Sequence, residues 1–189
     1  MAAQVTRLRM TNMSLALEIR PHPTDDRDAQ IERLLLRAEV DDFNAAYAAA
    51  LDAQRLVDWS EMFTEDASYV VLSRENHDSG LPVGLIYCEG RPMIFDRAFA
   101  LEKTAMFAPR YLRHIVSNTQ VLGVEPDGAI RARANYVVLQ VLFDRPDATL
   151  HQVGVYHDVF RREPDGLRLA KRHCVYDNLL VPNALCLPV

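Results

Sequence analysis

The chain has 189 residues, of which 49% are hydrophobic and 25% are charged, and this length and composition are typical of one globular domain. The formal net charge is −5, no run of lysine and arginine is interleaved with aromatic residues, and no apolar stretch approaches the roughly 20 residues that a membrane span needs. These features exclude nucleic acid and membrane as expected partners. The three cysteines are widely spaced, which argues against a disulfide scaffold and favours the reducing cytoplasm.

Residues 1–27 are predicted to form an N-terminal arm, and residues 28–189 a single domain. Pro21 and Pro23 interrupt the arm, because proline disfavours helix in the residue before it. Charged residues break up every apolar run in the arm and no small-residue cleavage site follows one, so a signal peptide is not expected.

A long helix is predicted from about residue 28 to residue 52. Asp25, Asp26 and Asp28 suit its N-terminus, where free N–H groups and the helix dipole favour anions. Apolar residues three and four positions apart give the helix one buried face: Leu36, Val40, Phe43, Tyr47, Ala50 and Leu51. A second, short helix is predicted over Leu56–Phe63 and carries the single tryptophan, Trp59.

Two β-rich runs follow, Ala67–Ser73 and Val83–Cys88. The polar segment between them, Asn76–Gly80, is predicted to be a turn, because aspartate and glycine favour turn dihedrals. A further helix is expected to start at Gly90–Pro92, where proline suits the first helical turn, and to end at Pro109. Its predicted buried stripe is Ile94, Ala98, Leu101 and Ala105.

The C-terminal part of the chain is predicted to be an antiparallel meander of long strands. Three turn signals rich in proline, aspartate and glycine divide it: Glu125–Gly128, Asp144–Asp147 and Glu163–Gly166. The β-rich runs between them are Tyr111–Gly123, Ala129–Phe143, Leu150–Arg162 and Leu167–Asp177. Long strands twist and coil, so the sheet should curve strongly. Helices followed by a curved sheet predict an α+β cone in which the helices pack on the concave face.

A catalytic metal site is not expected on this chain. A Rieske iron–sulfur cluster needs two cysteine and two histidine ligands. A mononuclear non-haem iron needs two histidines and one carboxylate. No cysteine has a histidine two or three residues later. His173 and Cys174 are neighbours, but adjacent side chains on a strand point to opposite faces.

His114 is the candidate for acid–base chemistry. It shares a strand face with Leu112 and Val116 and so should point into the cone, where Asp66 could reach it. A buried histidine beside a carboxylate can titrate near neutral pH, although a buried histidine with one hydrogen bond is the more common case. His151 and His157 lie six residues apart and could share an outer strand face.

Several segments resemble the small (beta) subunits of Rieske-type aromatic-ring-hydroxylating oxygenases. Their order and spacing carry the resemblance, which covers roughly residues 31–189. The Asn76–Gly80 loop and the Cys174–Asp177 ending look most similar to small subunits of salicylate 5-hydroxylase and terephthalate dioxygenase systems. The matching segments are Phe43–Tyr47, Trp59–Tyr69, Glu75–Leu81, Met93–Arg97, Arg113–Val116, Arg172–Asp177 and Val181–Asn183.

The resemblance implies a nuclear transport factor two-like (cystatin-like) cone and a hexamer of three large (alpha) and three small subunits, the small ones forming a trimer. It implies that the large subunit carries the Rieske [2Fe–2S] cluster and the mononuclear Fe(II), and that a separate reductase supplies electrons from NAD(P)H. The small chain is then mainly structural, without cofactor or metal, and no catalytic residue is carried over to it.

Two other functions remain open from the residues alone. A stand-alone dehydratase or isomerase would use His114 as base and Asp66 to orient it, with Tyr47 or Tyr69 as a polar group in the pocket. A ligand-binding or scaffold module without an enzyme partner is the third possibility. For the small-subunit reading, the expected interface anchors are Leu185, Leu187, Val189 and the Phe107–Tyr111 region.

Overall fold

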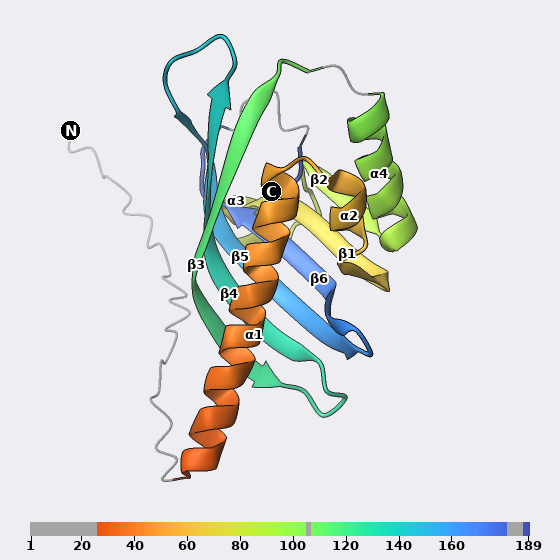
Figure 1. Cartoon of the computed structure of the whole chain (residues 1–189), viewed down its shortest axis with the longest axis vertical. Coiled ribbons are helices and arrows are strands. Elements are labelled where there is room, and N and C mark those ends of the chain that lie inside the picture. Colours follow the sequence, from red (N-terminus) through yellow and green to blue (C-terminus); the bar gives the residue numbers. More distant parts are fainter. Residues whose placement is uncertain (1–25, 105–106, 181–186) are drawn as a thin grey trace, which may run out of the picture.

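The computed structural model describes residues 26–104, 107–180 and 187–189, which form one six-stranded sheet with helices packed on it (Figure 1). The predicted α+β architecture is therefore confirmed, while the predicted arm lies almost entirely outside the described residues. No helix in the described part of the chain is long and apolar enough to cross a membrane. The helices are α1 (Arg27–Asp52), α2 (Leu56–Ser60), α3 (Arg74–Asp78) and α4 (Arg91–Lys103), and the strands are β1 (Phe63–Ser73), β2 (Ile86–Glu89), β3 (Arg110–Val124), β4 (Ile130–Leu142), β5 (Thr149–Glu163) and β6 (Gly166–Tyr176).

The sheet has the strand order β2-β1-β6-β5-β4-β3. Strands β3 to β6 form the predicted antiparallel meander, and their bounds lie within two residues of the prediction. Strand β1 closes the sheet by running parallel to β6, with Val70 opposite His173. Irregularities in the register interrupt four of the five strand pairs, and each such bulge bends the strand that contains it. Figure 1 shows the result, a strongly curved sheet with α1 lying across its inner face.

Helix α1 matches the predicted span because both its cap and its apolar face are present. The Asp26 side chain accepts hydrogen bonds from the backbone N–H groups of Asp28 (3.0 Å) and Ala29 (3.5 Å). Val40, Tyr47 and Leu51 are buried against the sheet. Leu36 and Phe43 pack on the same core but keep some exposure.

Several predicted element boundaries are wrong, and the strand predicted over Val83–Cys88, which is β2, starts only at Ile86. Strand β1 begins at Phe63, where a helix was expected, because the side chain of Phe63 is needed in the core. The segment expected to be a turn is helix α3, which starts where the Ser73 hydroxyl accepts the backbone N–H of Asn76 at 3.2 Å. Helix α4 ends at Lys103, before Pro109. Ile94 and Ala98 of its predicted stripe are buried, and Ala105 lies outside the described residues.

The core lies between the helices and the inner face of the sheet, and aromatic rings fill its centre. Trp59 of α2 meets Phe63 and Tyr69 of β1 edge to face, at centroid distances of 5.1 and 5.2 Å. Tyr47 of α1 joins them at 6.2 Å from Trp59. Each such pair contributes about 0.5–1.5 kcal/mol beyond the burial of apolar area, so this cluster fixes α1 and α2 on β1. Helix α3 lies on the opposite, outer face of the sheet.

Candidate functional site

The interior of the cone contains one fully buried ion pair. The Arg172 guanidinium on β6 donates to both carboxylate oxygens of Asp158 on β5, at 2.9 and 2.7 Å, and to Asn44 on α1 at 2.6 Å. It also lies between the rings of Tyr47 and Tyr156, 4.1 Å from each centroid. Burial raises the pKa of Asp158, and Arg172 opposes that shift. Hydrogen bonds and cation–π contacts therefore hold the guanidinium within the core, where an unpaired charge would be very costly.

The end of the described chain fills the space beside this ion pair. The carbonyl of Val189 accepts hydrogen bonds from the hydroxyls of Tyr47 (2.9 Å) and Tyr69 (3.1 Å), and its N–H donates to Tyr69 (3.0 Å). Burial raises the pKa of both tyrosines, so their hydroxyls stay protonated and can donate. Leu187 and Val189 belong to the hydrophobic core. They are therefore not the interface anchors that the sequence suggested, and Leu185 lies outside the described residues.

His114 points into the cone, but the structure does not bring Asp66 to it. The carboxylate at its Nδ1 is Asp52, 2.7 Å away at the C-terminal end of α1, and Asp52 also accepts the backbone N–H of His114 at 2.9 Å. The His114 side chain is fully buried and its Nε2 has no hydrogen-bond partner among the described residues. Asp66 is exposed and binds Arg161 and Thr64, and these hydrogen bonds, the Arg161 one first, lower its pKa.

His151 and His157 do not share a strand face. Strand β5 contains a bulge: Leu150 pairs with Leu139 and Gln152 with Val138, so His151 is the extra residue between two consecutive pairs. The bulge reverses the alternation that the even spacing predicted. His151 is buried on the inner side, where burial and then the nearby Arg110 lower its pKa. His157 lies on the outer side, and Asp158 next to it points inward, as the alternation requires.

Three histidines gather on the outer face, one on α3 and two on the strands beneath it. The ring of His77 stacks on that of His157 with the centroids 4.9 Å apart, and His157 lies directly opposite His173 in the sheet. His173 faces outward while Cys174 is buried in the core, as predicted for neighbours on a strand. Within the described residues, no group of three or more histidine, cysteine, aspartate or glutamate side chains has an arrangement that could hold a metal ion.

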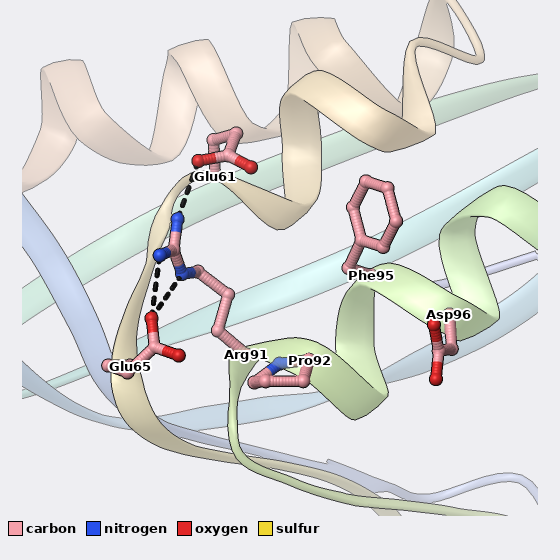
Figure 2. Close-up of a pocket in the computed structure, with 6 residues that line it drawn as sticks. All are labelled: Glu61, Glu65, Arg91, Pro92, Phe95 and Asp96. Carbon is pink, nitrogen blue, oxygen red and sulfur yellow. Dashed lines mark hydrogen bonds and ion pairs between the residues drawn. The ribbon is translucent and has the colours of Figure 1, made fainter.

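A shallow pocket of about 240 Å³ lies where α2, β1 and α4 meet. Figure 2 shows that Arg91, at the start of α4, reaches between Glu61 and Glu65, and the nearest contacts are 2.7 and 2.6 Å. Phe95 and Pro92 form its apolar side. Both carboxylates are paired with Arg91 and more than half exposed, so this pocket offers no activated reactive group.

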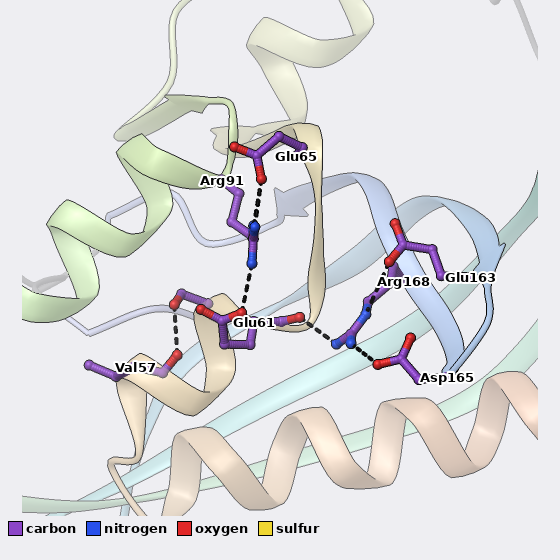
Figure 3. A network of polar contacts seen from close by, with 8 residues as sticks. Val57, Glu61, Glu65, Arg91, Glu163, Asp165 and Arg168 are labelled. Atoms are coloured by element: carbon purple, nitrogen blue, oxygen red, sulfur yellow. Dashed lines mark hydrogen bonds and ion pairs between the residues drawn. The ribbon is translucent and has the colours of Figure 1, made fainter.

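The same ion pairs extend to the β5–β6 turn (Figure 3). Arg168 of β6 binds the backbone carbonyl of Glu61 and the carboxylates of Asp165 and Glu163. The network thus joins α4, the start of β1 and the turn at Gly166. Exposed ion pairs contribute at most about 1 kcal/mol each, so the network aligns these elements rather than stabilising the fold strongly.

The sequence indicated His114 but not its partner. Asp52 lies 62 residues away in the chain, and a local pattern contains no information about such a contact. The buried pair of Asp158 and Arg172 was missed as well. A signal existed: both residues interrupt otherwise apolar inward positions, since Tyr156, Phe160 and Cys174 flank them on the same face.

A family model described as ring hydroxylating beta subunit matches residues 46–183. The anthranilate 1,2-dioxygenase small subunit of Burkholderia cepacia is 36% identical over 143 residues, which are 76% of this chain and 88% of that protein. Subunit beta 2 of the terminal oxygenase component of terephthalate 1,2-dioxygenase from a Comamonas species is 30% identical, over 78% of this chain and 94% of that protein.

A solved structure supports the same relationship. It is a beta subunit assigned to an aromatic-ring-hydroxylating dioxygenase of Novosphingobium aromaticivorans DSM 12444, and it superposes with a TM-score of 0.74 at 36% sequence identity. The match covers 86% of this chain and 99% of that one. The predicted cone, with N-terminal helices on a strongly curved sheet, is thereby confirmed, and its strands are antiparallel except for the parallel pair β1 and β6.

Proposed function

Because the chain belongs to the family of ring hydroxylating beta subunits, and is the non-catalytic small subunit of an aromatic-ring-hydroxylating dioxygenase, we propose that its task is to hold the large subunits of that enzyme in their assembly. The observation that carries this proposal is the match of residues 46–183 together with near-complete coverage of known small subunits. The dehydratase or isomerase reading, with His114 and Asp66, is not favoured.

The interior of the cone supports a structural role. At its centre Arg172 binds Asp158, and both tyrosines donate to the carbonyl of Val189. Other buried polar atoms there, such as the Tyr156 hydroxyl and Asn44 Nδ2, have no hydrogen-bond partner among the described residues. Leu187 occupies the core beside them. A substrate in the cone would have to displace these residues and leave two buried hydroxyls without an acceptor, and each such loss costs about 1–3 kcal/mol.

The outer surface supports a role in assembly. Five large apolar side chains on β2, α4 and the segment before β2 are 37–52% exposed, and we call them the β2–α4 surface: Leu85, Tyr87, Met93, Phe95 and Phe99. Phe95 and Phe99 stack on each other with the centroids 6.1 Å apart. At the opposite edge of the sheet, Tyr111 of β3 stacks on Phe143 with the ring centroids 4.5 Å apart, and both are at least 60% exposed. Contiguous exposed apolar surface marks interaction sites.

The proposed assembly is a hexamer of three large and three small subunits, with the small chains forming a trimer. In it the Rieske cluster and the mononuclear iron belong to the large subunit, and a separate reductase delivers electrons from NAD(P)H. The enzyme works in the cytoplasm on an aromatic carboxylate. Anthranilate and terephthalate, which name two relatives, are both carboxylates of aromatic rings, and this shared chemistry supports the substrate class.

The test is to express the small chain alone and together with its large subunit. We expect a colourless small-chain trimer by light scattering, which takes up the iron-containing large chain into a hexamer. Phe95→Glu with Phe99→Glu should prevent assembly, whereas Glu32→Lys on the exposed side of α1 should not. A brown small chain with a Rieske-type spectrum, or ring hydroxylation without a partner, would contradict the proposal.

The substrate class is tested with the assembled enzyme. Turnover of benzoate or a substituted benzoate is expected, with little turnover of the corresponding neutral hydrocarbon. The reverse preference would remove the carboxylate assignment and leave the structural role intact.

A further inference from the structure

A groove of about 400 Å³ lies on the outer face of the sheet, bordered by β1, β6, α3 and the segment that leads into β2. We call it the β6 groove. Its volume falls in the range of small-molecule sites. Most of its lining is apolar, and the titratable groups come from β6 (Lys171 and His173), α3 (His77) and β2 (Tyr87). The lining residues are Ser68, Val70, Leu72, His77, Gly80, Leu81, Pro82, Val83, Tyr87, Lys171 and His173.

The floor of the groove is built before any ligand arrives. Val70 and Leu72 point outward from β1 and are buried there against Val175 of β6, as a second small core. Leu81 and Val83 form the opposite wall and are at least 50% exposed. A flat apolar body such as an aromatic ring fits between such a floor and wall, and would cover apolar surface that is now in water.

The polar side of the groove lacks a counter-ion. Lys171 and His173 are two residues apart on β6, so their side chains stand on the same outward face about 6.6 Å apart along the strand. Lys171 has no ion-pair partner among the described residues. His77 completes the rim from α3, and its Nδ1 contacts Asp78 at 3.1 Å. Asp78 itself does not line the groove.

Cations and carboxylates both surround the polar side of the groove. Burial, and then Lys171 and the neighbouring histidines, lower the pKa of His173 to about 4. Burial, and then His77 and nearby cations, do the same for His157 beneath the rim, also to about 4. The titratable and charged groups around this cluster are Arg74, His77, Asp78, Tyr87, Glu89, Arg133, His157, Lys171, His173 and Asp177. Arg74 is paired with Asp177, whereas Lys171 lines the groove without an ion-pair partner among the described residues, so an anion is its complement.

We propose that the β6 groove binds a small aromatic carboxylate, with the ring over Val70 and Leu72 and the carboxylate between Lys171 and His173. The groove itself supplies the chemistry of the ligand, an apolar body joined to one carboxylate. The proposed function adds only that such acids are the substrates or products of the enzyme, so this inference rests on it for its biological setting. The groove would then hold the acid on the small subunit, away from the iron.

The first experiment is a titration of the full small chain with benzoate, followed by isothermal calorimetry and by NMR of the histidine ring protons. Benzoate should shift the resonances of His77, His157 and His173. Acetate, which lacks the ring, and benzyl alcohol, which lacks the charge, should each bind about tenfold more weakly or worse. Binding should tighten from pH 7 to pH 5, because a bound anion raises the pKa of the adjacent imidazoles and binding then takes up protons.

Variants separate the groove from the rest of the surface. Lys171→Ala should weaken benzoate binding by about tenfold or more, since a charge-assisted hydrogen bond is lost, and His173→Gln should reduce the pH dependence. Arg131→Ala is the matched control: it removes an exposed cation from β4 that is paired with Glu125, and binding should not change. Equal benzoate affinity in the Lys171→Ala variant and the parent chain would overturn the proposal.

The final arm uses the assembled oxygenase. If benzoate binds the isolated chain but uptake of the large subunit abolishes this binding, the groove belongs to the subunit interface and the proposal fails, while the proposed function stands. Light scattering measures hexamer formation separately. A small chain that forms no hexamer with the large subunit would count against the proposed function and not against the groove.

Discussion

On the inner face of the sheet, Asp158 and Arg172 are buried and bind each other. On the outer face His157 and Lys171, each one residue away on the same two strands, remain partly exposed and have no ion-pair partner among the described residues. A step of one residue along a strand thus separates two kinds of polar site. The charges of the inner one balance each other within the chain, so we expect it to set stability. The outer one lacks its counter-charge, so we expect it to set binding.

The sharpest way to break the inner network is Asp158→Ala. It leaves the Arg172 guanidinium buried without its carboxylate, and we expect a loss of about 3–5 kcal/mol in the free energy of unfolding, measured by urea denaturation. Asp66→Ala is the matched control, because it removes an exposed carboxylate from an ion pair with Arg161, and should cost less than about 1 kcal/mol. Similar losses in both variants would show that burial does not distinguish the two pairs.

Gly154→Ala tests how closely the inner face is packed. A Cβ at this position would lie 2.1 Å from the carbonyl oxygen of Val175 and 2.9 Å from the Tyr136 hydroxyl, so the backbone of β6 would have to move. We expect a loss of about 3 kcal/mol, the upper part of the range for overpacking. Gly123→Ala on β3 meets only the end of the flexible Arg131 side chain, at 3.9 Å, and should leave the unfolding midpoint nearly unchanged.

Asp52→Ala asks whether His114 is held for structure. The variant removes the acceptor of both the backbone N–H and the Nδ1 of this buried histidine, and should cost about 2 kcal/mol. Arg113→Ala removes only the exposed partner of the same carboxylate and should cost well under about 1 kcal/mol. Ring hydroxylation by the assembled enzyme should survive in both. Loss of turnover in an Asp52→Ala hexamer that still forms would revive a catalytic role for His114.

The smallest effect concerns pH and the outer face. The pKa of His157 and of His173 is about 4 in the folded chain, below the ordinary value of 6.5, so the unfolded chain binds more protons between these values. Stability is therefore fully present above pH 6.5 and falls as the pH drops towards 4. Because both rings are partly exposed, solvent reduces the loss to about 1 kcal/mol. Urea denaturation across this range measures it, and His157→Gln with His173→Gln should flatten the profile.

Much of the fold could be predicted because its strands are separated by strong local signals. Turns at Glu125–Gly128 and Glu163–Gly166 fixed the ends of β3 to β6, and the three- and four-residue spacing of apolar residues fixed α1. Helix α3 was missed because five residues are too few for a periodic pattern to show. The parallel pairing of β1 with β6 was also missed, because it joins segments far apart in the chain.

The candidate sites were predicted less well, for three physical reasons. Long-range partners such as Asp52 for His114 depend on how a helix end meets a strand, which alternation along the strand does not contain. A single bulged residue, His151, lies on the inner side of β5, although its even spacing to His157 placed both on one face. Leu187 and Val189 show a third limit: apolar residues near a chain end fit an interface as well as a core, and only the fold shows that they are buried within the chain itself.

The burial of Val189 between Tyr47 and Tyr69 also bears on the order of refolding. The two hydrogen bonds join residues 142 and 120 positions apart in the chain. Contacts between residues so far apart close long loops, which is slow compared with the formation of helices and hairpins. We therefore expect the meander of β3 to β6 to form first, and the aromatic faces of α1 and β1 to be covered last.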